Sequence, residues 1–287
     1  MRTPMRLALS LFALLAAGSS AVAQGVVFHE GFENGLGAWT VSGLWQAQGE
    51  AEACTQVHAP FPGGTTCAWF GSDSTCTFDP QPWDGSLTLA GDIPLPQTGG
   101  AISLRFTSWS EGEDDGVWDL RRTWISSNGG ASWTLLGFTY SNYFVLGWQF
   151  ALPDRWITQT HDLTAWAGQS VRLRFEFWAG DWWLNDMKGW LLDEVVVESH
   201  EGPAIPFCAG DGTNGRCPCD NYGASGRGCA ASFDAGGGLL EAQGVASLAA
   251  DTLLLTATHV GTSSSFLSQG ESQANFGVGA PFGVALR

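Results

Sequence analysis

The stretch GQSVRLRFEFWAGDWWLNDMKGWLLDEVVVES, residues 168–199, contains two segments with the alternation typical of β-strands. From 171 to 177, apolar side chains at the odd positions alternate with charged ones, which predicts a strand with one buried and one solvated face. The second segment carries Asp193 and Glu194 directly before three valines. A carboxylate on an apolar strand face costs several kcal/mol unless it has a partner. We therefore expect Asp193 to be bound by another group.

Similar short segments recur upstream, separated by clusters of Gly, Asn, Asp and Pro, and no stretch keeps a period of 3.6 residues. We expect strands at 25–32, 67–71, 86–90, 101–109, 120–126, 132–138, 156–163, 171–177 and 190–198. Asn128 and Gly129 are expected to form a tight hairpin turn, with Trp133 packing back across the pair. Short strands at this spacing predict an all-β fold built as a sandwich of two sheets.

The two ends of the chain differ in composition from this region. Residues 1–23 have a basic start, an apolar run and small residues at 21 and 23, which is the pattern of a secretory signal peptide. All 15 tryptophans lie between Trp39 and Trp190, whereas the region after Pro206 is rich in Gly, Ala and Ser. We predict a β-sandwich domain over 24–200, a linker over 201–207 and a small disulfide-rich β module over 208–287.

The charge and the hydropathy of the chain restrict its partners. Without the predicted leader, 10 basic residues (12 minus 2) remain against 28 acidic ones, so nucleic acid is excluded as a partner. The acidity fits a solvated surface or cation binding. The apolar run of the leader is too short to cross a bilayer, and no later segment is long enough, so we predict no membrane span. The protein is expected to be secreted or held at the cell surface.

All seven cysteines follow the predicted leader, which fits disulfide bonds formed in an oxidising compartment. The candidates are Cys54, Cys67 and Cys76 in the first domain and Cys208, Cys217, Cys219 and Cys229 in the second. The second group lies in a polar, glycine-rich stretch that needs disulfides in place of a core. A zinc cluster is the alternative, but C-P-C lacks the two-residue gap of a zinc knuckle. Seven is odd, so at least one thiol is left over, and the pairing stays open apart from the disfavoured pair Cys217–Cys219.

Three segments, in this order, resemble MAM-like modules: FHEGFENGLGAW at 28–39, WISSNGGASWTLL at 124–136, and DLTAWAGQSVRLRFEFW at 162–178 with GWLLDEVVV at 189–197. Such modules are jelly-roll β-sandwiches of the concanavalin A-like kind. They occur in adhesion and receptor ectodomains and behind the catalytic domain of immune inhibitor A type metallopeptidases. Residues 208–287 resemble a Cys-rich β module of large secreted bacterial proteins. Copies of that module continue with another Cys, so we expect the chain to be truncated at Arg287.

The resemblance also implies a metal site. Modules of this kind, and the carbohydrate-binding modules that they look like, often hold a structural calcium ion where the first and last strands meet. The matching positions here are Glu33, Glu30 and Asp193, whose oxygen atoms suit a hard cation such as Ca²⁺. The alternative is that Asp193 accepts backbone N–H bonds at a strand bulge, or pairs with Arg172 or Arg174.

Trp182 and Trp183 are the candidate ligand-binding residues. Neighbours in an extended segment face opposite ways, so at least one of the two indoles is expected to lie outside the core. Exposed indoles stack on sugar rings and anchor protein interfaces. The alternative is that a folded loop or the neighbouring domain covers both.

These features favour a non-enzymatic binding or adhesion protein that recognises an extracellular protein or glycan. The chain has no H-E-x-x-H or G-x-S-x-G motif, and His161 and Asp162 are expected to point to opposite faces of a strand. One alternative is a carbohydrate-binding module that accompanies a hydrolase. The other is a hydrolase of unrecognised type that uses Glu111 and Glu113 as its acid and base.

Overall fold

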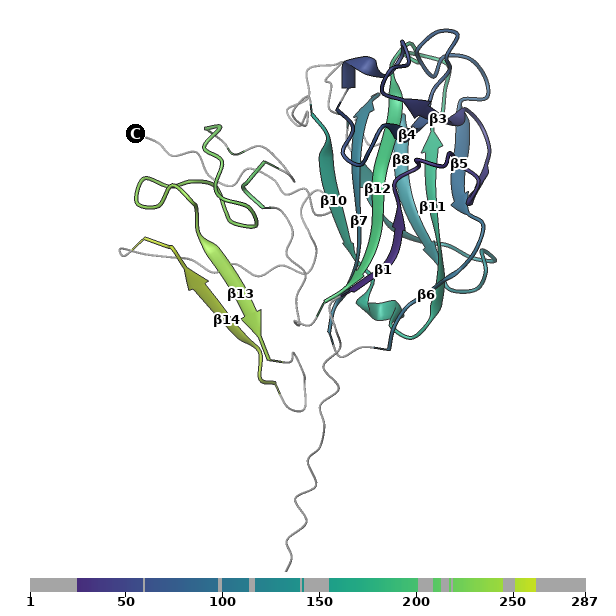
Figure 1. The fold of residues 1–287 in the computed structure, drawn as a ribbon. Coiled ribbons are helices and arrows are strands. Elements are labelled where there is room, and N and C mark those ends of the chain that lie inside the picture. Colours follow the sequence, from purple (N-terminus) through teal and green to yellow (C-terminus); the bar gives the residue numbers. More distant parts are fainter. Residues whose placement is uncertain are drawn as a thin grey trace, which may run out of the picture.

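The computed structural model describes residues 25–58, 60–97, 100–113, 117–139, 141, 155–200, 209–212, 217, 219–244 and 251–261. Up to residue 200 the described chain forms two six-stranded antiparallel sheets that face each other as a sandwich (Figure 1). Two 3₁₀ turns, Gln56–His58 and Thr164–Trp166, are the only helical elements of the described residues. The predicted all-β sandwich is confirmed.

The first sheet has the order β10-β7-β12-β4-β3, with β1 paired to the far end of β12. Its strands are β1 (Gly25–Glu30), β3 (Trp45–Gly49), β4 (Thr66–Phe70), β7 (Ile102–Glu111), β10 (Ile157–Asp162) and β12 (Gly189–Ser199). The first and last strands of the domain lie side by side, with Gly25 opposite Ser199 and Glu30 opposite Val195. This pairing brings the opening and closing segments of the domain together.

The second sheet has the order β2-β5-β11-β8-β9, with β6 paired to the start of β11. Its strands are β2 (Trp39–Val41), β5 (Asp84–Leu89), β6 (Ile93–Pro94), β8 (Leu120–Ser126), β9 (Thr134–Thr139) and β11 (Ser170–Trp178). The turn between β8 and β9 differs from the prediction, because the positive φ angles fall on Gly129 and Gly130 and not on Asn128. Asn128 instead accepts the Ser132 N–H and so closes the turn.

The core between the sheets is built largely from aromatic side chains. Alternate residues of a strand point into this core. In β11, for example, the side chains at the odd positions 171–177 are fully buried. Phe70 and Phe177 stack across the sandwich with ring centroids 4.4 Å apart. Trp190 is also fully buried and contacts the rings of Trp45, Phe106 and Phe175. Most of the tryptophans therefore serve to pack the domain.

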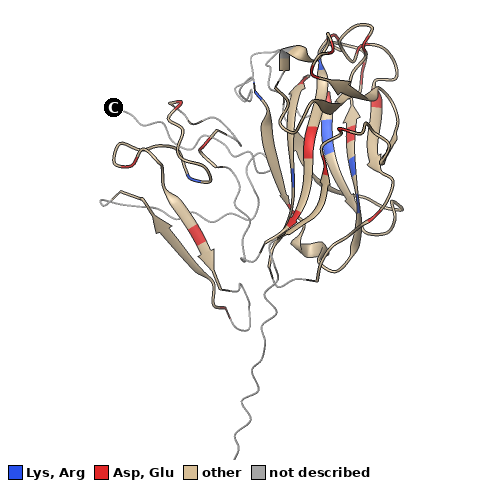
Figure 2. Ribbon diagram, in the orientation of Figure 1, with Lys and Arg blue, Asp and Glu red and all other residues tan. Residues whose placement is uncertain are grey.

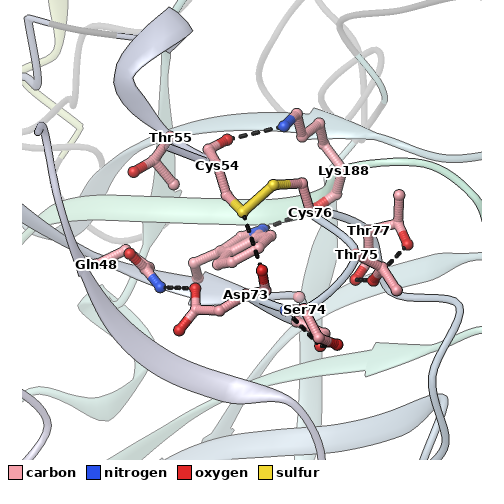
Figure 3. The surroundings of a disulfide bond; sticks show 12 residues. Gln48, Cys54, Thr55, Asp73, Ser74, Thr75, Cys76, Thr77 and Lys188 are labelled. Atoms are coloured by element: carbon pink, nitrogen blue, oxygen red, sulfur yellow. Dashed lines mark hydrogen bonds between the residues drawn. A yellow bond between two sulfur atoms is a disulfide. The ribbon is translucent and has the colours of Figure 1, made fainter. Parts of the chain in front are cut away.

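A second, smaller cluster lies on the outer face of the first sheet. Residues 50–58 and 60–65 contribute Cys54 and Phe61 to it, and the sheet contributes Cys67, Trp69, Trp109 and Leu191. The disulfide Cys54–Cys76 ties the segment down (Figure 3). Lys188 reinforces it, because its Nζ donates to the Cys54 carbonyl at 2.8 Å. The chain thus covers one face of the sandwich with its own loop.

Cys67 is a correction to the predicted disulfides. It is a free thiol, fully buried on β4 beneath the covering segment, while Cys54 pairs with Cys76 instead. Burial raises the pKa of the Cys67 thiol well above its ordinary value, and the charges of Asp193 and Glu33 add to this. Cys67 therefore remains a protonated, unreactive core residue.

Strand β12 contains a bulge that changes the expected facing of Asp193. Asp193 lies opposite Thr107 and Val196 opposite Arg105, so two residues of β12 face one residue of β7. Glu194, with φ of 50°, occupies the bulge. Strict alternation along the segment predicts that Asp193 shares a face with Val195, and this prediction is wrong because the inserted residue reverses the alternation. Asp193 lies on the outer face, under the covering segment.

After residue 200 the described residues contain a hairpin and one disulfide. Strands β13 (Leu239–Gln243) and β14 (Leu254–Thr258) pair with each other, and Cys217 is bonded to Cys229. Cys219 is exposed and has a free thiol, which corrects its assignment as a disulfide cysteine, and Cys208 and the predicted linker lie outside the described residues. Of the helices among the described residues, none has the length and hydropathy to cross a membrane.

Candidate functional site

Asp193 lies at the centre of an acidic cluster on the outer face of β12. Its side chain is fully buried, and Oδ2 accepts the Gly63 N–H at 2.9 Å while Oδ1 accepts the Glu194 N–H at 2.7 Å. These are the backbone bonds at a bulge that the alternative interpretation predicted. Arg172 and Arg174 make their contacts on the other sheet, so neither pairs with Asp193.

Two glutamates adjoin Asp193 through the Gly63–Gly64 turn. Glu33 accepts the N–H groups of Thr65 and Thr66 at 2.9 and 2.7 Å, and a Cβ on Gly64 would lie 2.5 Å from its carboxyl carbon. A Cβ on Gly63 would collide with the Glu194 carboxylate. Only glycines at both positions allow the turn to approach the carboxylates this closely.

The pKa values of this cluster are shifted in opposite directions. Burial raises the pKa of Asp193 to about 7, since the nearby charges of Glu194 and Glu33 add to desolvation and outweigh the two backbone bonds. Desolvation raises the pKa of Glu33, but the three hydrogen bonds that its carboxylate accepts from Thr65 and Thr66 together outweigh this effect. The net shift of the Glu33 pKa is therefore downward. The cluster therefore combines a carboxyl that resists ionisation with one that ionises readily.

The donor set suits a hard cation in its chemistry. The carboxylates of Asp193, Glu33 and Glu194 approach the Gly63–Gly64 turn. The Gly63 carbonyl oxygen and Glu194 Oε1 both lie beside Gly31, since a Cβ on Gly31 would be 3.7 Å from the first and 3.2 Å from the second. Among the described residues, no three His, Cys, Asp or Glu side chains are placed to share one metal ion. A cation held here would therefore depend on backbone carbonyls as well as carboxylates.

Glu30 belongs to a different local structure. Its two carboxylate oxygens accept the Phe32 N–H at 2.8 Å and the Trp39 Nε1–H at 3.2 Å. These bonds hold the turn that follows β1, where Phe32 has a φ of 57°. Of the three predicted metal ligands, the structure brings Glu33 and Asp193 together and uses Glu30 elsewhere.

The predicted indole pair lies in the loop that follows β11. The side chains of Trp182 and Trp183 are 68% and 58% exposed, and their rings meet edge to face with centroids 5.8 Å apart. The Asp181 carboxylate accepts the Trp183 N–H, and the buried Asn185 side chain bonds the Asp181 carbonyl. The loop is thus anchored at its base and presents both indoles to solvent.

The outer face of the second sheet is a row of charged and aromatic side chains that the sequence alone did not single out. Arg122 bonds Glu176 at 3.4 Å, Trp124 donates to Glu176 at 2.7 Å, and the Arg174 guanidinium lies 3.9 Å from the ring centre of Trp133. Figure 2 shows bands of Lys and Arg colour on β8 and β11 of this sheet. Alternation in the sequence predicts which side chains of β11 point outward. The register between β11 and its neighbouring strands decides which of these side chains contact each other on the outer face.

Glu111 and Glu113, the candidate acid and base of the hydrolase alternative, lie at the end of β7 and just after it. Glu111 accepts the Lys188 N–H at 2.9 Å, and Glu113 is buried, with its N–H donated to Asp119 at 2.7 Å. Asp119 is almost fully buried, and burial raises its pKa to about 7. His161 is buried and Asp162 exposed, so this adjacent pair does point to opposite faces.

Comparisons with known proteins give no match to a protein-family model and none to a curated protein. Among solved structures, the K2 cleaved adhesin domain of Lys-gingipain is 18% identical with a TM-score of 0.38, covering 62% of this chain and 99% of that one. The CBM22-1 xylan-binding domain from Paenibacillus barcinonensis Xyn10C is 12% identical with a TM-score of 0.36, covering 64% and 98%. TmCBM61, solved in complex with β-1,4-galactotriose, is 17% identical with a TM-score of 0.34, covering 59% and 94%. At these values the likeness does not extend to function.

Proposed function

We propose that this chain is an exported, non-enzymatic binding module that recognises a glycan or an extracellular protein. The observation that carries the proposal is the exposed pair Trp182 and Trp183 in an anchored loop at the end of β11. The two disulfides fit the oxidising compartment that export implies. The sandwich is of the MAM-like jelly-roll type in this proposal, and residues 208–287 form a Cys-rich module behind it.

The indole pair favours recognition because its exposure is otherwise unfavourable. Each ring leaves a large apolar area in water, and burying it against a sugar ring or a protein surface recovers that free energy. The buried Asn185 and the Asp181 carbonyl fix the base of the loop, so little conformational entropy is lost when a ligand binds. A rigid, exposed aromatic pair is typical of a binding surface.

Replacing Trp182 or Trp183 with alanine should weaken binding at least about tenfold, because aromatic anchors dominate such interfaces. The measurement is binding of the full mature chain to an array of polysaccharides and to cell-surface protein extracts, followed by titration calorimetry with each glycan that binds. Phe233→Ala is the matched control, since Phe233 is a 60% exposed aromatic residue of the second module. Equal affinity in the tryptophan variants and the control would refute the role of the loop.

We propose in addition that a calcium ion stabilises the sandwich at Asp193 and Glu33. The support is the approach of three carboxylates to the Gly63–Gly64 turn, those of buried Asp193, partly buried Glu194 and exposed Glu33, whose mutual repulsion contributes to the raised pKa of Asp193. A divalent cation would remove that repulsion and complete its shell with carbonyl oxygens and water. The ion would join the first and last strands to the covering segment.

Calcium should raise the thermal unfolding midpoint at pH 8, with a stabilisation of about 3 kcal/mol at a hundredfold excess over Kd. The effect should shrink below pH 6, because protonation of Asp193, whose pKa is about 7, competes with the ion. Differential scanning calorimetry in calcium and in chelator measures both. Asp193→Asn and Glu33→Gln should abolish the increment, whereas the exposed Glu52→Gln should keep it. An unchanged midpoint at pH 8 would rule out the ion.

A further inference from the structure

Arg174 differs from the other arginines on the outer face of the second sheet. Arg172 donates to Asp92 at 2.8 Å and Arg122 to Glu176 at 3.4 Å, so both guanidinium groups are paired with carboxylates. Arg174 forms no ion pair with any described residue. Its Nε donates to the Thr88 hydroxyl at 3.1 Å, which leaves the two terminal amino groups of the guanidinium unengaged within the described part of the chain.

The position of this guanidinium is fixed before any ligand arrives. The Trp133 indole stacks against it at 3.9 Å, and the Thr88 hydroxyl holds its near edge. Partial burial lowers the pKa of Arg174, which the charge of Glu176 offsets only in part, but an arginine stays protonated at neutral pH. A charged, partly desolvated group without a counter-ion is unfavourable, and it is stabilised by an anion that reaches its free edge.

The shape of the group selects the anion. A guanidinium held by Nε presents its two amino groups as a fork, and this fork matches the two oxygens of a carboxylate. The protein carries a net charge of −16, so polyanions are repelled over most of its surface and a carboxylate must be bound by local contacts. Specific recognition is therefore expected, and general anion binding is not.

We propose that Arg174 binds the carboxylates of an acidic polysaccharide, a chain of uronic acid residues laid along the outer face of β11. This inference rests on the proposed binding function and names its ligand class. Glu176 and Trp178 continue the outward row of β11, and Trp178 lies about 13 Å from Arg174 at the usual rise per residue. Beyond Trp178 the chain enters the loop of Trp182 and Trp183. A ligand that reaches both ends of this surface is several sugars long.

A polysaccharide fits this face better than an acidic peptide does. The exposed indoles of Trp182 and Trp183 offer flat surfaces on which sugar rings stack. The Ser86 and Thr88 hydroxyls and the Glu176 carboxylate offer hydrogen bonds to ring hydroxyls. Glu176 would repel a polyglutamate segment at the centre of the face. Each sugar of a uronic acid chain carries hydroxyls beside its carboxylate, so hydroxyls can face Glu176 while a carboxylate faces Arg174.

The test is titration of the full mature chain with polygalacturonate, alginate and hyaluronan in sodium buffer at low ionic strength. Methyl-esterified polygalacturonate is the matched ligand, because it keeps the sugar backbone and loses the carboxylate charge. We expect binding to at least one of the three acids and at least tenfold weaker binding to the ester.

Three variants assign the effect to Arg174. Arg174→Gln and Arg174→Lys should both weaken binding to the acid about tenfold or more, since lysine keeps the charge but not the fork. Arg172→Gln is the control, because its guanidinium is already bonded to Asp92, and its effect should be several-fold smaller. Circular dichroism and the unfolding midpoint check that each variant keeps the fold.

The outcomes separate this inference from the function on which it rests. Equal affinity for the acid and its ester, or for a neutral glucan, would overturn the carboxylate assignment and leave glycan binding intact. Binding of poly-glutamate as tight as that of the uronic acids would overturn it in favour of an acidic peptide. No binding to any of the three acids would also overturn it, and the tryptophan variants then decide the broader function independently.

Discussion

The free energy of unfolding, measured in chelator, should fall as the pH is raised from 4 to 8, by on the order of 4 kcal/mol for each of Asp193 and Asp119. Burial raises the pKa of both carboxyls from 3.8 to about 7 in the folded protein. Between these values the unfolded chain releases the two protons while the folded chain retains them. The stability that they contribute is complete below about pH 4 and lost as the pH rises through 7.

His161 acts in the opposite sense over part of this range. Burial lowers its pKa from 6.5 to about 4, so the folded protein keeps the ring neutral where the unfolded chain would protonate it. Its contribution is present above pH 6.5 and is lost as the pH falls towards 4. Between about pH 4 and 6.5 the decline in stability should therefore be smaller than the two carboxyls alone would give.

Urea unfolding of the wild type and of Asp193→Asn, Asp119→Asn and the double variant, at half-unit steps of pH, measures this effect. Each single variant should lose about half of the carboxyl contribution to the pH dependence, and the double variant should show the His161 contribution alone. Comparing curves of the same variant at different pH removes the constant cost of each amide substitution. Parallel curves for wild type and Asp193→Asn would mean that Asp193 is ionised throughout.

Trp190→Ala should destabilise the sandwich by about 4 kcal/mol, the usual cost of removing a large aromatic side chain from a core. Trp190 is fully buried and contacts aromatic rings from both sheets, with Phe175 and Trp45 at centroid distances of 5.8 and 5.6 Å. The cavity cannot be filled by one strand alone, because its walls belong to two hydrogen-bonded sheets. Urea unfolding followed by near-ultraviolet circular dichroism measures the loss.

Replacing Trp69 or Trp190 with phenylalanine separates the loss of a hydrogen bond from the loss of packing volume. The Trp69 Nε1–H donates to the Lys188 carbonyl at 2.7 Å, and Trp69→Phe leaves that carbonyl without its donor. The Trp190 Nε1–H has no hydrogen-bond partner among the described residues, so Trp190→Phe removes volume alone. We expect Trp69→Phe to cost about 1 kcal/mol more than Trp190→Phe. A loss below about 2 kcal/mol for Trp190→Ala would contradict the central role of this side chain.

The strands were predictable because alternation is a local property of the chain. The nine expected segments all contain a strand, and β11 matches almost residue for residue. Three strands were missed, namely β2, β3 and β6, which have three, five and two residues. Segments this short give too few alternations to distinguish from a loop. The change in composition after Pro206 stays a prediction of a domain boundary, because residues 201–208 lie outside the described residues.

The candidate sites were predictable only in part. Placing Glu33 near Asp193 required the resemblance to MAM-like modules, since 160 residues of sequence carry no information on their distance. The adjacency of Trp182 and Trp183 predicted that at least one indole lies outside the core, and only the structure shows that both are exposed. The contact of Arg174 with Trp133 was not predictable, because it depends on how β11 pairs with β8 and where the β8–β9 turn places its aromatic residue.

By itself the sequence determined the class of fold and the alternating faces of its longer strands, since both depend on neighbours along the chain. Tertiary structure alone decided the bulge at Glu194, the covering segment held by Cys54–Cys76 and the free thiol of Cys67. One inserted residue in β12 reverses which side of the sheet a side chain faces, and that insertion is set by the pairing with β7. The chemistry at Asp193 and at Arg174 thus arises from register between strands that are distant in sequence.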